Sequence, residues 1–131
     1  MTKIVNLNEI WQKQKEFQYH FYDPDALAED TRVALTKEYI LCIHRELGEV
    51  LNNTPWKLHR ANNAIYDIPH AQEELIDCFK FLINLCILQG MTPESFKQLF
   101  FKKSKIVEQR YQDEIVEPSK NGQLTLPFNN E

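Results

Sequence analysis

Apolar residues recur at three- and four-residue intervals along most of the chain, which is the pattern of helices that bury one face. Four segments show it, and we expect helices at about residues 7–19, 31–51, 69–90 and 92–111. The clearest boundary is the start of the last one, where Thr92 is the expected N-cap and Pro93 takes the first helical position after Gly90. The pattern therefore predicts an all-α chain.

The second half of the third expected helix is apolar almost all round. From Phe79 to Leu88 only Lys80 and Asn84 interrupt the apolar run. A helix of that kind is buried on several sides, and a second copy is the simplest partner for it in a chain of 131 residues. We therefore predict a bundle of four to five helices that is completed by a homodimer, with a tetramer as the alternative.

Composition narrows the class of protein. No apolar run approaches the roughly 18 residues that a membrane span needs, and the first residues do not resemble a signal peptide. Fifteen Lys and Arg against 19 Asp and Glu give a net charge of −4, which argues against direct binding to nucleic acid. The three cysteines form no CxxC pair. We expect a cytoplasmic protein with reduced cysteines that does not associate with the membrane. We also expect one domain at residues 1–117 and a flexible tail at 118–131.

Two pairs of acidic residues are the most informative feature. Glu46 and Glu49 are three residues apart on one expected helix, and Glu74 and Asp77 are three apart on the next. This spacing places each pair on one helix face, beside apolar residues that must be buried. Carboxylates at such an edge need compensation, and oxygen-only ligands suit Mg²⁺. Two solvated faces are the alternative. A di-iron bundle would need Glu-x-x-His pairs, which neither motif supplies.

These acids resemble the signature of the all-α nucleoside triphosphate pyrophosphohydrolase superfamily, which includes the MazG-like enzymes and the dimeric dUTPases. That signature is ExxE on one helix and ExxD on the next, and here 24 residues lie between Glu49 and Glu74. The resemblance covers about residues 7–112. It extends to Gln14 on the first expected helix, to Asn52 and the Trp56-Lys57 pair after the first motif, and to Lys103 and Arg110 on the last helix.

The resemblance implies a MazG-like or dimeric-dUTPase-like bundle with a defined set of roles. Glu46, Glu49, Glu74 and Asp77 would hold two or more Mg²⁺ ions, with Mn²⁺ as an alternative. Glu46 and Glu49 would act in catalysis, and Glu46 is our choice for the general base. Lys57, Lys103 and Arg110 would bind phosphates. Gln14, Asn52 and Trp56 would contact the base and sugar, with Trp11 and Phe17 as further stacking candidates.

The activity implied is hydrolysis of a nucleoside triphosphate between its α and β phosphates, with dUTP or another pyrimidine deoxynucleotide as the substrate. Two positions depart from the dimeric dUTPase pattern, because Val107 replaces an asparagine and Lys80 replaces a histidine. A MazG-like house-cleaning enzyme for other or modified nucleotides is therefore one alternative. The other is a helical interaction protein without catalysis.

The tail contains a short motif of a different kind. Residues Gln123–Phe128 read Gln-Leu-Thr-Leu-Pro-Phe, which resembles the peptide by which bacterial proteins dock on the DNA polymerase sliding clamp. Glutamine would fill a polar subsite, and the following apolar residues would enter an apolar pocket. The alternative is that this segment packs against its own domain or the other subunit.

Overall fold

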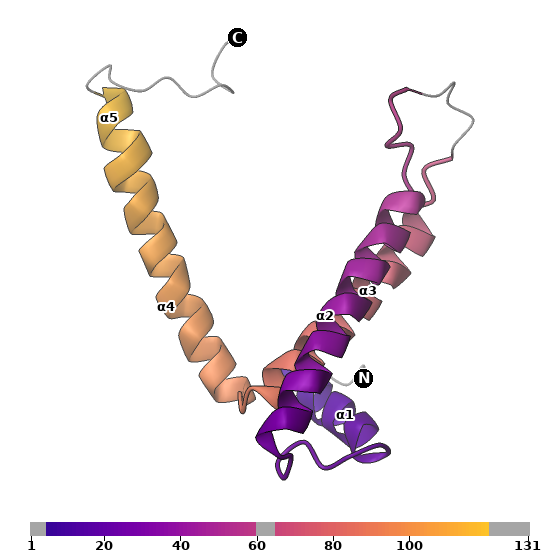
Figure 1. Cartoon of the computed structure of the whole chain (residues 1–131). Coiled ribbons are helices and arrows are strands. Elements are labelled where there is room, and N and C mark those ends of the chain that lie inside the picture. The colour runs from indigo at the N-terminus through magenta and orange to yellow at the C-terminus, as the bar shows by residue number, and fades with distance from the viewer. Residues whose placement is uncertain (1–4, 60–64, 121–131) are drawn as a thin grey trace. The chain divides into compact units, whose positions relative to one another are not determined.

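The computed structural model of the chain describes residues 5–59 and 65–120, and within these ranges it contains helices and no strand (Figure 1). The elements are α1 (Leu7–Tyr19), α2 (Glu29–Asn52), α3 (Ile68–Leu88), α4 (Pro93–Tyr111), the π-helical stretch η1 (Gln112–Val116) and α5 (Glu117–Lys120). The predicted all-α class is confirmed. Two boundaries differ, since α2 begins two residues before the expected start and the last helical segment continues through η1 and α5.

Local side-chain chemistry explains where the helices begin and end. The Asn6 side chain accepts a hydrogen bond from the Glu9 N–H at 3.1 Å and caps α1. Asp67 caps α3 in the same way, through the His70 N–H at 3.2 Å. Gly90 follows α3 with a φ of 77°, a conformation that favours glycine, and so ends the helix where the sequence indicates.

Helices α2 and α3 run antiparallel, side by side (Figure 1). Four contacts between them follow a seven-residue repeat on both helices. In each pair the first residue comes from α2 or its C-cap and the second from α3 or its N-cap. The pairs are Arg32 with Leu88, Tyr39 with Phe81, Glu46 with Glu74, and Asn53 with Asp67. A heptad repeat is typical of a coiled-coil seam, so we call this row of pairs the seam. It fixes which turns of the two helices face each other.

Helix α1 packs against the C-terminal half of α3 through apolar and amide groups together. Trp11 is 4% exposed and Leu88 is fully buried. Gln14 and Gln18 are also buried, and both donate hydrogen bonds to α3. Buried amides need such partners, which makes the placement of α1 on α3 specific.

The chain divides after Thr92 into two compact units, which are described separately. The first contains α1, α2 and α3, and the second contains α4, η1 and α5. Among the described residues no single helix is both long and apolar enough to cross a membrane. The broken pair formed by Ile68–Leu88 and Pro93–Lys120 meets that test only when its parts are taken together, by length and composition.

Candidate functional site

The seam places three of the four predicted acidic residues together. Glu46 comes from α2, and Glu74 and Asp77 come from successive turns of α3. One carboxylate oxygen of each lies within 4.8 Å of the others. Glu46 and Glu74 are half-buried while Asp77 is exposed, so the cluster is open to solvent on one side. Such an opening would admit a ligand.

The electrostatics of this cluster are unfavourable without a cation. A hydrogen bond with Glu46 raises the pKa of Glu74 above its ordinary value, with desolvation and the negative charges of Glu46, Asp77 and Glu49 acting in the same direction. The folded chain thus holds like charges that repel each other. Three carboxylates from two helices form an all-oxygen donor set, which fits a hard divalent cation such as Mg²⁺.

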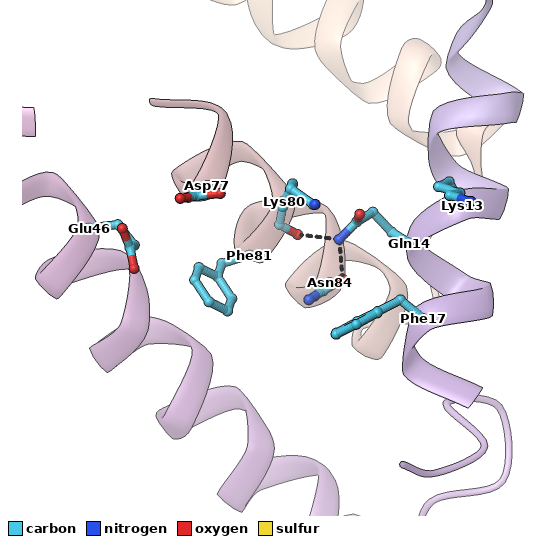
Figure 2. A pocket seen from close by; sticks show the side chains of 8 residues that line it. All are labelled: Lys13, Gln14, Phe17, Glu46, Asp77, Lys80, Phe81 and Asn84. Carbon is cyan, nitrogen blue, oxygen red and sulfur yellow. Dashed lines mark hydrogen bonds between the residues drawn. The ribbon is translucent and has the colours of Figure 1, made fainter. Parts of the chain in front are cut away.

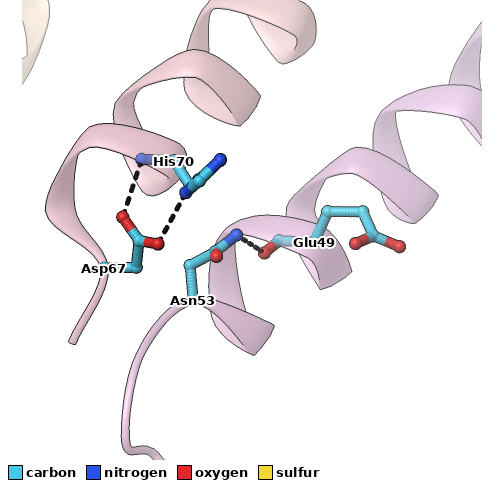
Figure 3. A network of polar contacts seen from close by, with 4 residues as sticks. All are labelled: Glu49, Asn53, Asp67 and His70. Carbon is cyan, nitrogen blue, oxygen red and sulfur yellow. Dashed lines mark hydrogen bonds and ion pairs between the residues drawn. The ribbon is translucent and has the colours of Figure 1, made fainter. Parts of the chain in front are cut away.

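Glu49, the fourth predicted acid, lies one turn further along α2. Its carboxylate is not part of the group within 4.8 Å, although its charge contributes to the raised pKa of Glu74. Its backbone carbonyl accepts a hydrogen bond from Asn53 Nδ2 at 2.8 Å (Figure 3). Glu49 therefore lies close to the cluster without being one of its three members.

A pocket of about 360 Å³ begins at the acids and extends to α1 (Figure 2). It is lined by Lys13, Gln14, Phe17, Glu46, Asp77, Lys80, Phe81 and Asn84. Two of the acids thus form one end of the pocket, and two aromatic, two amide and two lysine side chains form the rest. A concave site that combines aromatic surface with convergent polar groups is typical of a small-molecule site.

The amides in this pocket have a determined orientation. Gln14 Nε2 donates to the Lys80 carbonyl at 3.3 Å and to Asn84 Oδ1 at 3.0 Å (Figure 2). A backbone carbonyl can only accept, so Gln14 must present its NH₂ group to α3 and Asn84 must present its oxygen. Gln14 Oε1 has no donor among the described residues and remains free to accept a hydrogen bond from a ligand.

A second polar arrangement lies at the N-terminal end of α3, one turn from Glu74. His70 Nδ1 is 2.5 Å from Asp67 Oδ2, in addition to the capping bond (Figure 3). The hydrogen bond to Asp67 raises the pKa of His70 above its usual value, and the same contact lowers that of Asp67. The imidazole is exposed, and Asp67 holds its Nδ1, so its Nε2 is left for another partner.

The remaining predicted residues of the first unit lie outside the pocket. Asn52 is exposed at the end of α2. Trp56 is 45% exposed, and the Lys57 ammonium lies 5.6 Å from its ring centroid in a cation–π contact. None of the three is among the residues that line the pocket. Their roles in base and phosphate binding stay predictions.

Lys103 and Arg110 both lie exposed on α4, in the second unit. Seven residues separate them, so they share one face of that helix as the sequence indicates. Their role in phosphate binding also stays a prediction. Residues 121–131, and with them the clamp-like motif at Gln123–Phe128, lie outside the described part of the chain.

Sequence reasoning missed several residues of the pocket. Lys13, Phe81 and Asn84 were not predicted to be part of a site, and Lys80 was noted only as a departure from a family pattern. Asn84 had a usable signal, because it is a lone amide in an apolar helical run and is only 3% exposed. A buried amide in such a run must find a partner, and here the partner is Gln14.

Comparison with known protein families adds an independent finding. The model of a family described as dUTPase matches residues 6–125, which is most of the chain. Neither the curated proteins nor the solved structures compared with the chain include a match. The matched region contains both acidic motifs and every residue that lines the pocket. The chain therefore belongs to this dUTPase family, which is the all-α family that its two acidic motifs resemble.

Proposed function

We propose that the chain is a Mg²⁺-dependent pyrophosphohydrolase that cleaves dUTP to dUMP and pyrophosphate. The supporting observation is that the acid cluster and the amide-lined pocket adjoin each other, sharing Glu46 and Asp77. A nucleoside in the pocket would have its α-phosphate beside the acids. The family match supports the same reaction class.

The acids have two tasks in this proposal. Glu46, Glu74 and Asp77 hold Mg²⁺, with Glu49 as a further ligand. Mn²⁺ is the alternative ion at this site. Bound Mg²⁺ supplies charge neutralisation at the phosphate oxygens and lowers the pKa of water. Glu46, which faces both α3 and the pocket, orients and deprotonates the attacking water.

The amide network supports uracil over cytosine. Gln14 Oε1 is an acceptor, because its Nε2 is committed to Lys80 and Asn84. Uracil carries a donor at N3–H, whereas cytosine carries a lone pair at N3. In a pose that places N3 against Gln14 Oε1, uracil would donate to that oxygen and cytosine would face it with a second acceptor. An unmatched polar contact of this kind is penalised more strongly than a missing apolar one.

Lys80 supports a second candidate, a broader range of nucleotides. Its side chain lines the pocket, and an ammonium group donates to any carbonyl oxygen within reach. Such a group does not distinguish among bases that carry carbonyls. A MazG-like activity on other or modified nucleotides would therefore use the same pocket with less selectivity.

A homodimer is part of the proposal because one side of the α2–α3 pair is apolar and exposed. In antiparallel helices, the residue after each seam position turns to the same side of the pair. That side, which we call the apolar face, contains Ile40, Leu47, Leu75 and Leu82, with Leu51 and Phe79 one turn beyond Leu47 and Leu75. All six side chains are exposed. Lys80 and Asn84, which contact α1, turn to the opposite side. A second copy would cover the apolar face without blocking the pocket.

The tail and the cations of the second unit complete the proposal. Lys103 and Arg110 would neutralise phosphate charge, together with Lys57.

The peptide Gln123–Phe128 would dock on a sliding clamp and bring the enzyme to sites of replication. Binding of a synthetic Gln123–Phe128 peptide to a purified clamp tests the second point, with a Gln123→Ala, Leu126→Ala peptide as the control.

Turnover of a deoxynucleotide panel tests the proposed function. Pyrophosphate release should require Mg²⁺ and should be faster with dUTP than with dCTP at equal concentration. Similar rates for all pyrimidine and purine nucleotides would favour the broader candidate. Absence of turnover for every nucleotide, at saturating Mg²⁺, would contradict the enzyme proposal and favour the interaction protein.

A further inference from the structure

The groups described above lie in a fixed order along one face of α3. Asn84, Asp77, Glu74, His70 and Asp67 are separated by seven, three, four and three residues, which keeps them on one stripe of the helix. The pocket lies at the C-terminal end of this stripe, the acids are in the middle, and the Asp67–His70 pair is at the N-terminal end.

This order sets a direction for a bound nucleotide. With the base beside Gln14 and Asn84 and the α-phosphate beside the acids, the β and γ phosphates point away from the pocket. His70 is four residues from Glu74, which is about 6 Å along the helix axis. That is the distance that one or two further phosphate groups would cover.

We propose that His70 binds the pyrophosphate portion of the substrate through Nε2, and that Asp67 is the positioning residue that orients its imidazole. This inference rests on the proposed function, because it needs the α-phosphate at the acid cluster. It assigns a phosphate contact to a side chain that neither the acidic motifs nor the family resemblance singled out.

The local geometry suits this role. Asp67 is held by the first turn of α3 through the capping bond, and its other oxygen holds His70 Nδ1. The Asp67 backbone N–H donates to the Asn53 carbonyl at 2.9 Å, which anchors the cap to the end of α2. Nε2, on the ring edge away from Asp67, is therefore presented from a supported position (Figure 3). The residue spacing puts His70 on the same stripe of α3 as Glu74 and Asp77.

Charge supplies the reason for a cation here. Three acidic groups lie near His70, namely Asp67, Glu73 and Glu74, at the N-terminal end of α3. These groups favour the imidazolium form, whose Nε2–H can donate to a phosphate oxygen. Without such a donor, the terminal phosphates would lie near acidic side chains that repel them.

Inhibition of dUTP hydrolysis by inorganic pyrophosphate tests the inference, with binding of dUMP as the internal reference. In the presence of Mg²⁺, His70→Gln should weaken inhibition by pyrophosphate about tenfold or more and raise the KM for dUTP. Binding of dUMP, which lacks the phosphates in question, should be unchanged. His44→Gln, a change at an exposed histidine elsewhere on α2, is the matched control and should behave as the unmodified chain.

Asp67→Asn keeps a side-chain oxygen for the cap and removes the charge that orients His70. It should weaken pyrophosphate inhibition as His70→Gln does, and the double variant should be no worse than His70→Gln alone. Unchanged pyrophosphate inhibition in His70→Gln, or equal losses of pyrophosphate and dUMP binding, would overturn the inference. The proposed function fails separately, if the unmodified chain hydrolyses no nucleotide.

Discussion

Gln14 Nε2 lies 3.0 Å from Asn84 Oδ1, and this hydrogen bond joins two buried side chains that are 70 residues apart in the chain. It both fastens α1 to α3 and determines which atoms of the pocket face a ligand. Removing one partner leaves the other buried and unpaired, which costs about 1–3 kcal/mol.

Gln14→Ala should therefore lower the free energy of unfolding by about 1–3 kcal/mol and reduce the preference for dUTP over dCTP. Urea denaturation and the ratio of kcat/KM values measure the two effects. Gln12→Ala, a change at an exposed glutamine of α1, should alter stability by less than about 0.5 kcal/mol. If the dUTP preference survives in Gln14→Ala, another group must read the base.

Asp77→Asn should reduce turnover by roughly 10²-fold or more, because it removes a charge that would hold Mg²⁺ at the phosphate. The helices should remain folded, since Asp77 is exposed and is not part of the core. Initial rates at saturating Mg²⁺, together with circular dichroism, check both points. Glu73→Gln removes a neighbouring acid that is not in the cluster and should keep near-normal rates. Near-normal turnover in Asp77→Asn would show that the cluster is not the metal site.

Glu74 connects pH with stability, and its raised pKa gives the sign. A carboxyl group that binds its proton more tightly in the folded chain stabilises the fold below its ordinary pKa, and this contribution is lost as the pH rises through the folded pKa. At neutral pH without metal, Glu74→Gln should therefore raise the melting temperature. Thermal unfolding in EDTA at pH 7.5 measures this, and a lower melting temperature than that of the unmodified chain would contradict it.

Mg²⁺ should reverse that relationship. A cation that binds the folded cluster stabilises the unmodified chain by mass action, so its melting temperature should rise with Mg²⁺ concentration. Glu74→Gln should respond less. The stabilisation should weaken as the pH falls through the pKa of Glu74, because protons and Mg²⁺ compete for the same oxygens. An equal response of both proteins at pH 7.5 would place Mg²⁺ elsewhere.

The apolar face gives a prediction about assembly. Leu47→Glu or Phe79→Glu should convert a dimer into a monomer, because each places a charge in an interface that must exclude water. Light scattering after size-exclusion chromatography measures the mass. Lys37→Glu, at an exposed polar position of α2, should leave the mass unchanged. A monomeric unmodified chain would remove the homodimer from the proposal.

The sequence alone was sufficient for the four long helices and for the shared face of Glu74 and Asp77, because helical periodicity and end signals are local. Helix α3 ends just before Gly90 and α4 begins at Pro93, as expected. A spacing of three places Glu74 and Asp77 on one face of α3. The earlier start of α2, at Glu29, and the continuation of the last helical segment to Lys120 are helix ends that local signals define poorly.

Tertiary structure decided which of these residues meet. The heptad seam brings Glu46 to Glu74 and Asp77 and leaves Glu49 outside that group, since register depends on contacts along the whole length of both helices. Asn84 and Phe81 became pocket residues only because α1 packs against their part of α3. Periodicity reports which side of a helix is buried, whereas the partner that buries it is a property of the folded chain.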